Sequence, residues 1–184
     1  MPAVVQSDPG YGVYFRRQDY AGFGRRLLIV VADGLVAAGF CIPLATALWA
    51  VIPSEEQAAA VTLPACAIVL FFYFVALKRS RIGTLGYRIG GVRIVGLDGQ
   101  PPGWFALTVR LLFAALGPVG WLLDMLWLSG DPHRQALRDK LAQTYVVRRH
   151  AQPAGTGRVV YSYCDICFYN FLFREVQVQP PEKR

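Results

Sequence analysis

Three charged side chains lie inside long apolar stretches, and these are the residues from which chemistry or a fixed ion pair would be expected. Asp33 lies in the run from Leu27 to Ile52. Arg110 and Asp124 lie in the run from Trp104 to Leu128. A charged side chain at the centre of an apolar membrane helix costs about 2.5 to 3.5 kcal/mol, so each should face protein, water or a counter-charge rather than lipid. We therefore take the three as a candidate charged core.

Two further charges belong to the candidate set. Arg26 lies about two helical turns before Asp33, so both side chains would point to one side of a helix, roughly 10 Å apart along its axis. An arginine at the start of an apolar helix is most often an anchor in the lipid headgroups. We expect Arg110 to be the cationic partner of Asp33, with Arg26 as the second choice. Asp139, in a shorter stretch, is expected to cap or pair within its own helix, or to be solvated.

The apolar runs define the elements that must position these charges. A helix needs about 20 apolar residues to cross the bilayer core. We expect three membrane helices, at about 25–52, 58–77 and 104–128. In the third, the stretch between Arg110 and Asp124 is short for a full crossing, and Gly117-Pro118 could break it into a re-entrant hairpin. A crossing and a re-entrant segment both remain open from the sequence.

The composition agrees with a membrane protein and argues against the soluble classes. Hydrophobic residues make up 54% of the 184 residues and charged residues 17%, where a soluble domain has about 25%. The formal net charge is +7. Because most basic residues flank the apolar runs, we expect anionic lipid headgroups as their partners, not nucleic acid. The lipid bilayer is then the main partner, and a homo-oligomer is compatible with this interpretation.

The charges beside the first two helices predict the orientation. Lys78 and Arg79 follow the second apolar run directly, whereas the connection between the two runs carries Glu55 and Glu56 and no basic residue. By the positive-inside rule, the amino-terminus and residues 78–93 are cytoplasmic and residues 54–57 are external. The expected location is therefore the cell membrane, as an integral, multi-pass protein.

Shorter segments complete the expected architecture. Residues 81–103 are rich in Gly and Pro and predict a short strand with a tight turn at Asp98-Gly99, not a helix. Residues 133–149 predict a short amphipathic helix that runs into an extended segment on the cytoplasmic face. The expected fold class is an all-α membrane protein with about three transmembrane or re-entrant helices, a small β-turn element and this amphipathic helix. Along the chain we expect a flexible cytoplasmic arm, a membrane domain and an aromatic-rich tail, at 1–19, 20–149 and 150–184.

No motif predicts a catalytic, metal or cofactor site. The glycines between positions 83 and 91 lack the spacing of a phosphate-binding loop. Cys164 and Cys167 form a single CxxC, and His133 and His150 are the only histidines, so the chain is poor in ligands for a four-ligand zinc site. We expect no enzyme activity, no metal and no cofactor.

Three ordered motifs resemble the RDD family of small integral membrane proteins, which is named after one arginine and two aspartates. The segment AGFGRRLLIVVADGL is similar to the family's opening motif and places the arginine at Arg26 and the first aspartate at Asp33. The segment GTLGYRIGGVRIVGLDGQP is similar to its central Gly-rich stretch, and ALRDKLAQTYVVRR to its closing motif, with the second aspartate at Asp139. Arg110 and Asp124 also fall where the family often carries an arginine and an aspartate.

The resemblance covers roughly residues 18–149 and has three departures. Tyr87 stands where Lys is usual, Arg138 where His is common, and Gln143 where Gly is usual. Membership implies a small multi-pass membrane protein, and transport is the activity proposed for the family as a whole. It implies no catalytic residue and no cofactor.

Two functions from different classes are compatible with these observations. One is a small transporter or ion-translocating protein in which Asp33, Arg110 and Asp124 line a polar path. The other is a non-catalytic membrane scaffold or assembly factor whose buried charges are structural. A water-filled cavity reaching Asp33 would favour the first function, and a dry, sealed set of contacts would favour the second.

Overall fold

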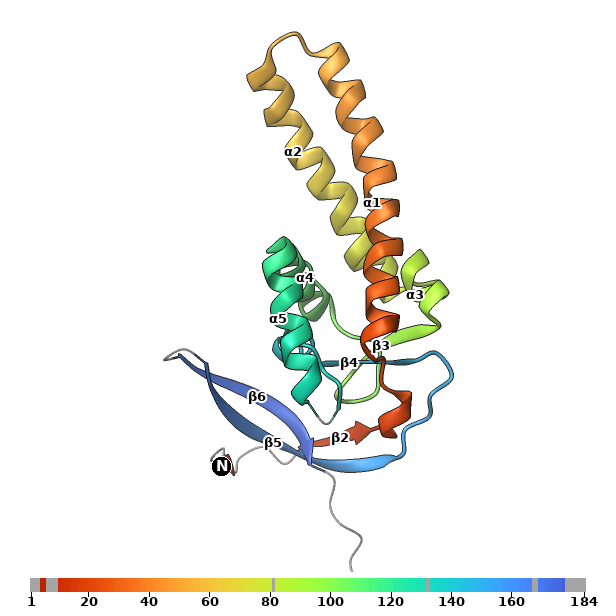
Figure 1. Ribbon diagram of the computed structural model, residues 1–184, viewed down its shortest axis with the longest axis vertical. Coiled ribbons are helices and arrows are strands. Elements are labelled where there is room, and N and C mark those ends of the chain that lie inside the picture. Colours follow the sequence, from red (N-terminus) through yellow and green to blue (C-terminus); the bar gives the residue numbers. More distant parts are fainter. Residues whose placement is uncertain (1–3, 6–9, 81, 132, 167–168, 178–184) are drawn as a thin grey trace, which may run out of the picture. The chain divides into compact units, whose positions relative to one another are not determined.

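The computed structural model describes residues 4–5, 10–80, 82–131, 133–166 and 169–177 (Figure 1). The chain folds as two compact units, one formed by residues 23–91 and one by residues 1–22 together with 92–184. The first unit contains long apolar helices. The second combines a bent helix pair with two antiparallel sheets. Each unit is described by itself.

A hairpin of two long helices forms most of the unit of residues 23–91 (Figure 1). Helix α1 spans Phe23–Val51, and α2 spans Glu55–Phe71 and continues as a π-helical stretch, Phe72–Leu77. Both are long and apolar enough to cross a membrane, as the sequence predicts. Large apolar side chains point away from the protein along both helices, with Leu35 70% and Leu63 73% exposed. A surface of this kind is stable in lipid rather than in water.

A short helix, α3 (Leu85–Gly90), follows the hairpin and packs against α1. Thr84 caps its first turn, and Gly91 ends it in the left-handed conformation, with φ +60°. The prediction that no continuous helix runs through residues 90–99 is confirmed. The expectation of no helix anywhere in residues 81–103 is wrong, because α3 lies within this segment. Thr84 caps the start of this short helix and Gly91 caps its end.

In the other unit, α4 (Trp104–Ala114) and α5 (Gly117–Gly130) replace the expected third helix. Their axes are bent by 110° at the break, where Gly117 has φ +63° and Pro118 occupies the first turn of α5. The break predicted at Gly117-Pro118 is confirmed, because glycine reaches this φ without strain and proline fits a first turn. Whether the pair crosses as a broken span or re-enters stays a prediction.

The strand predicted near Val92 is present as β3 (Val92–Gly96), but its partner is β4 (Thr144–Arg148). The two strands are antiparallel and join segments that lie far apart in the chain. Helix α6 (Leu137–Leu141) precedes β4, which confirms the predicted order of a short helix and an extended segment.

A second sheet joins the two ends of the chain. Strands β5 (Gly155–Ile166) and β6 (Tyr169–Gln177) form a long antiparallel hairpin, and β2 (Tyr11–Tyr14) and β1 (Val4–Val5) pair with β5 (Figure 1). The chain is mostly helical, as predicted, but the two sheets correct the all-α expectation. Alternating aromatic and β-branched residues in the amino-terminal segment and the tail favour strands. The division into arm, membrane domain and tail stays a prediction.

The core of this unit lies where the sheets meet the approach to α1. Phe15 and Tyr20, on either side of a 3-10 turn (η1, Arg17–Asp19), pack edge-to-face with Tyr145 of β4. Tyr145 is fully buried. Tyr20 also forms a single bridge with β4, and the Ala21 amide donates to the Val146 carbonyl at 2.8 Å. The chain is therefore fixed immediately before it enters the first apolar helix.

Candidate functional site

Asp33 lies on the buried face of α1, where three neutral donors reach its carboxylate. The Tyr73 hydroxyl and the Gly86 amide donate to Oδ1, at 2.9 and 2.8 Å. The Thr84 hydroxyl donates to Oδ2 at 2.9 Å. The side chain is 2% exposed. Each hydrogen bond to a carboxylate is stronger than a bond between neutral groups, so these contacts offset much of the cost of burying the charge.

The glycines in the segment after α2 allow α3 to pack closely against this carboxylate. A Cβ at Gly86 would lie 2.6 Å from Asp33 Oδ1 and 2.7 Å from the Ile29 carbonyl oxygen. A Cβ at Gly90, one turn later, would lie 2.9 Å from Ile29 Cγ1. Arg25 donates to the Gly90 carbonyl at 2.8 Å and so caps the other end of α3. The glycines therefore permit close helix packing, as small residues do in membrane proteins.

The expected pair of Asp33 with Arg110 would join the two units and stays a prediction. Each of the two residues has other partners within its own unit. Asp33 is bound by groups of its own unit, and Arg110 forms an ion pair with Asp139. Arg26, the second-choice partner, is buried on the same helix as Asp33, 3% exposed. A short capped helix supplies Asp33 with hydrogen-bond donors, which the sequence pattern of charges alone does not reveal.

Arg110, on α4, is the centre of a second buried site. Its guanidinium Nη1 contacts Asp139 Oδ1 and donates to the Thr144 hydroxyl at 2.7 Å. Asp139 Oδ2 accepts from the Ala136 amide at 3.1 Å and caps α6. Asp139 therefore caps its own helix as expected, but its ion-pair partner lies on another helix, and because it is fully buried its expected solvation is wrong. The pair joins α4 to α6 and to the start of β4.

The residues beside Asp139 in α6 pair with two further elements. Arg138 Nε lies 2.9 Å from Asp124 Oδ2 on α5, and its amide donates to Asp124 Oδ1 at 3.0 Å. Lys140 Nζ lies 2.6 Å from Asp131 Oδ2 and also pairs with Glu175 of β6. Three consecutive charges of one short helix thus hold α4, α5 and the sheet hairpin together. The expected amphipathic helix on a membrane face is not confirmed.

Several hydrogen-bond and ion-pair partners in these sites are not predicted from the sequence. Thr84 has a usable signal, because a threonine before a short helix is a typical N-cap. Tyr73 and Thr144 carry none, since a hydroxyl in an apolar or strand segment is common. Lys140 and Asp131 look like solvated charges in the sequence. The second partner of Lys140, Glu175, lies on β6, far along the chain.

Burial and the paired charges shift the titration of groups around α6. Burial alone would lower the pKa of Lys140, but its contacts with Asp131 and Glu175 outweigh burial and raise the pKa above its ordinary value. Burial lowers the pKa of His133, against the opposing charges of Asp131 and Glu175. Burial raises the pKa of Tyr20 to about 12. At neutral pH Lys140 is therefore a fixed cation, and His133 favours its neutral form.

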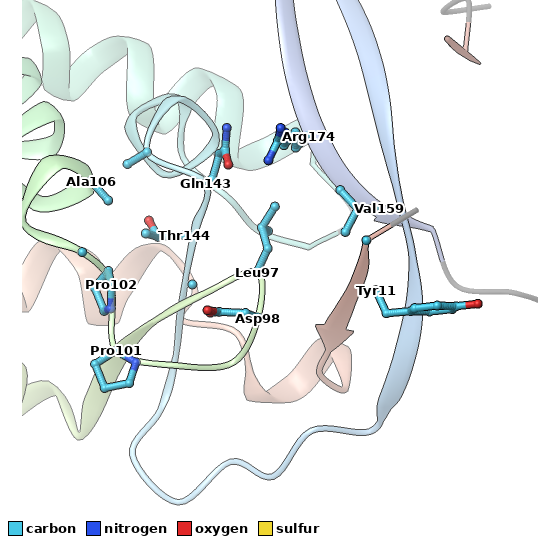
Figure 2. Close-up of a pocket in the computed structure, with 14 residues that line it drawn as sticks. Tyr11, Leu97, Asp98, Pro101, Pro102, Ala106, Gln143, Thr144, Val159 and Arg174 are labelled. Atoms are coloured by element: carbon cyan, nitrogen blue, oxygen red, sulfur yellow. The ribbon is translucent and has the colours of Figure 1, made fainter. Parts of the chain in front are cut away.

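A separate pocket of ≈ 380 Å³ opens beside the second site (Figure 2). In Figure 2, Asp98, Pro101 and Pro102 of the β3–α4 loop line one part of it, and Gln143 and Arg174 line another. Thr144, which binds Arg110, is the link between this pocket and the buried ion pair. The five candidate charges do not line it. Of the predicted CxxC pair, Cys167 lies outside the described residues.

Comparison with known proteins identifies the family. No curated protein and no solved structure matches the chain. The model of the RDD family matches residues 20–143, a segment that contains the buried Asp33 site, the Arg110–Asp139 pair and the Asp124–Arg138 pair. This segment covers well over half of the sequence, and the apolar helices α1 and α2 agree with a membrane protein. The chain belongs to the RDD family.

Proposed function

We propose that this RDD protein is a non-catalytic membrane scaffold that holds a β-containing module at the membrane surface. The observation that carries the proposal is that its buried charges have direct partners within the protein. Asp33 has three hydrogen-bond donors, and Arg110 and Asp124 pair with Asp139 and Arg138. Charges held in this way fix how helices pack.

A translocating group has to exchange its partners for a solute, a proton or water. Removing one member of a buried ion pair costs about 3–5 kcal/mol, because the charge left behind has no compensation. A fully bonded carboxylate such as Asp33, 2% exposed, is therefore better suited to a fixed structure than to repeated binding and release. We propose no enzyme activity and no cofactor for this chain.

The proposed location is the cell membrane, with the amino-terminus in the cytoplasm. The basic residues after α2 and the acidic connection before it support this orientation by the positive-inside rule. Helices α4 and α5, of 11 and 14 residues, are each shorter than the bilayer core, which requires about 20 residues. We propose that this bent pair re-enters, so that the carboxyl-terminus is cytoplasmic too. The basic flanks then face anionic lipids, and the sheets offer a surface for a protein partner or a second copy.

One observation favours the second candidate function, ion translocation. The α4–α5 pair is broken by 110° at Gly117, and broken helices at membrane depth are common around the ion sites of transporters. The two candidates make opposite predictions for flux.

A flux assay distinguishes the two candidate functions. It uses purified full-length protein in liposomes that contain a pH-sensitive dye. Proton, Na⁺ and K⁺ gradients are applied in turn to wild type, Asp33→Asn and protein-free vesicles. We expect wild type and Asp33→Asn to leak no faster than empty vesicles. A wild-type flux that Asp33→Asn abolishes, in protein that still elutes as a single species, would overturn the scaffold proposal and favour translocation.

A further inference from the structure

An open hollow of ≈ 540 Å³ lies at the amino-terminal approach to the first apolar helix. Arg16, Arg17, Gln18 and Arg134 line it. Three arginines from two distant segments of the chain therefore line one open hollow. Asp19 is the acidic residue next to these arginines in the sequence, and it is not part of the lining. The hollow is positively charged, and guanidinium groups match the geometry of phosphate oxygens through paired N–H donors.

The loop that carries Arg16 and Arg17 is held rigidly at both ends. Phe15 and Tyr20 are 4% and 3% exposed, and the Phe15 amide donates to the Tyr20 hydroxyl at 3.1 Å. Arg16, Arg17 and Gln18 between them are exposed. The polar side chains thus point outward from a turn whose backbone is already ordered. This lowers the entropic cost of ordering the site when an anion binds.

Arg134 reaches the hollow from an unusual backbone conformation. Its φ is +49°, in the left-handed region that residues other than glycine seldom adopt. The Asp131 carbonyl accepts from the Arg134 amide at 3.1 Å, and the Asp131 carboxylate is occupied by Lys140 and by the His133 and Gln135 amides. Strained positions that are held by surrounding contacts are frequent at binding sites.

The hollow lies close, along the chain, to a helix that could cross the membrane. A Cβ on Gly22 would lie 3.3 Å from Arg134 Nη1, so this guanidinium packs against the residue directly before α1. Helix α1 is long and apolar enough to cross the bilayer, and Arg17 precedes its first residue, Phe23, by only six residues. Lipid phosphates are therefore available close to this part of the chain.

We propose that the Arg16, Arg17 and Arg134 hollow binds the phosphate of an anionic phospholipid headgroup. The shared chemistry is a phosphate oxyanion, which a lipid or free phosphate could supply, and the short chain distance to a helix that could cross the membrane favours the lipid. This inference deepens the proposed contact of the protein with anionic lipids and rests on the proposed membrane scaffold. It assigns that contact to one site with three named arginines.

The test uses the full-length protein in nanodiscs of phosphatidylcholine, with phosphatidylglycerol added at increasing fractions. Native mass spectrometry counts retained phosphatidylglycerol and gives its apparent affinity. The variant Arg16→Gln/Arg17→Gln is compared with Arg148→Gln/Arg149→Gln, which removes the same charge from an exposed pair elsewhere. We expect an affinity loss of about 10- to 30-fold in the first variant, since each basic residue at an anionic surface contributes about fivefold in affinity. We expect no such loss in the second.

Arg134→Lys extends the test to the third arginine, because it keeps the charge and loses the paired donors. We expect intermediate binding from it. Equal loss in both double variants overturns the assigned site in favour of unspecific charge attraction. No loss in either variant overturns it because these arginines then do not bind the lipid. Competition by millimolar inorganic phosphate overturns the lipid assignment in favour of free phosphate. Flux in the liposome assay bears on the scaffold proposal alone, so the two can fail separately.

Discussion

Arg110 and Asp139 form a buried ion pair that links α4 to α6, and Thr144 at the start of β4 shares the same guanidinium nitrogen. Their side chains are 6% and 0% exposed. A pair with so little access to water stabilises the packing of the elements that carry it, because each charge compensates the other. Removing one member leaves the other charge buried without compensation. The closing motif of the family match thus has a structural role that can be measured.

Breaking this pair should destabilise the protein strongly. We expect Asp139→Asn to cost about 3–5 kcal/mol, because Arg110 cannot lose its proton and keeps its charge without this carboxylate. Arg110→Gln should cost less, since a carboxylate left alone can take up a proton. The double variant Arg110→Met/Asp139→Leu should lie closer to wild type than Asp139→Asn does. Thermal stability in detergent, followed by size-exclusion fluorescence, measures the order.

Arg88→Gln is the matched control for this series, because Arg88 is exposed on α3. It should stay within about 0.5 kcal/mol of wild type. Equal melting temperatures for Asp139→Asn and Arg88→Gln would contradict a structural role for the pair.

Gly86 should tolerate no side chain. In Gly86→Ala the new methyl group would meet both the Asp33 carboxylate and the Ile29 carbonyl, at 2.6 and 2.7 Å, so α3 must move away from α1. We expect a loss of about 1–3 kcal/mol. Gly34→Ala is the control, since a Cβ there meets nothing within 4 Å, and it should be neutral or stabilising by up to about 1 kcal/mol. Equal thermal stability of the two variants would show that α3 does not pack against α1 as described.

The apolar helices and their break could be read from the sequence because each depends on local properties. Length and apolarity fix α1 and α2, and Gly117-Pro118 fixes the break between α4 and α5. The ion pairs could not be read in the same way. Asp33 was expected to need a cation, yet neutral donors from a capped turn satisfy it.

The sheets show the same limit of local reasoning. The turn at Asp98-Gly99 is predictable from the sequence, because an Asp-Gly pair is a typical turn signal. In the structure, Gly99 has φ +78° and Asp98 accepts from the Gln100 amide at 3.0 Å. The partner of β3 is not, since β4 begins many residues later in the chain. Long-range strand pairing depends on how the intervening helices fold back, and no local pattern carries that information.

Cysteine accessibility tests the proposed orientation. In a background without native cysteines, Gln18→Cys and Gln100→Cys should be labelled only after the cytoplasmic side is opened, and Gln57→Cys from outside. Arg149→Cys separates the two paths of the α4–α5 pair, because a re-entrant pair leaves this residue cytoplasmic and a crossing pair exposes it outside. Labelling of Gln100→Cys in intact cells would reverse the orientation.

The stability of the protein should fall as the pH drops below neutrality, and His133 should contribute to that fall. Its ring packs near Tyr20 and Tyr145, with centroids 5.6 and 6.1 Å away, and burial lowers its pKa in the folded state. In the unfolded chain a histidine has a pKa of about 6.5. Below that pH the unfolded chain binds a proton that the folded protein does not, so the free energy of unfolding decreases as pH falls through 6.5.

His133→Gln removes this term and keeps the backbone bond from residue 133 to Asp131 Oδ1. Its stability between pH 7.5 and 5 should therefore depend less on pH than that of wild type, by less than about 1.4 kcal/mol per pH unit, the limit for one proton. His150→Gln, which replaces an exposed histidine, is the matched control. Melting curves at matched ionic strength give the slopes. A steeper slope in His133→Gln would mean that the folded protein gains the proton more readily than the unfolded chain, which contradicts the effect of burial.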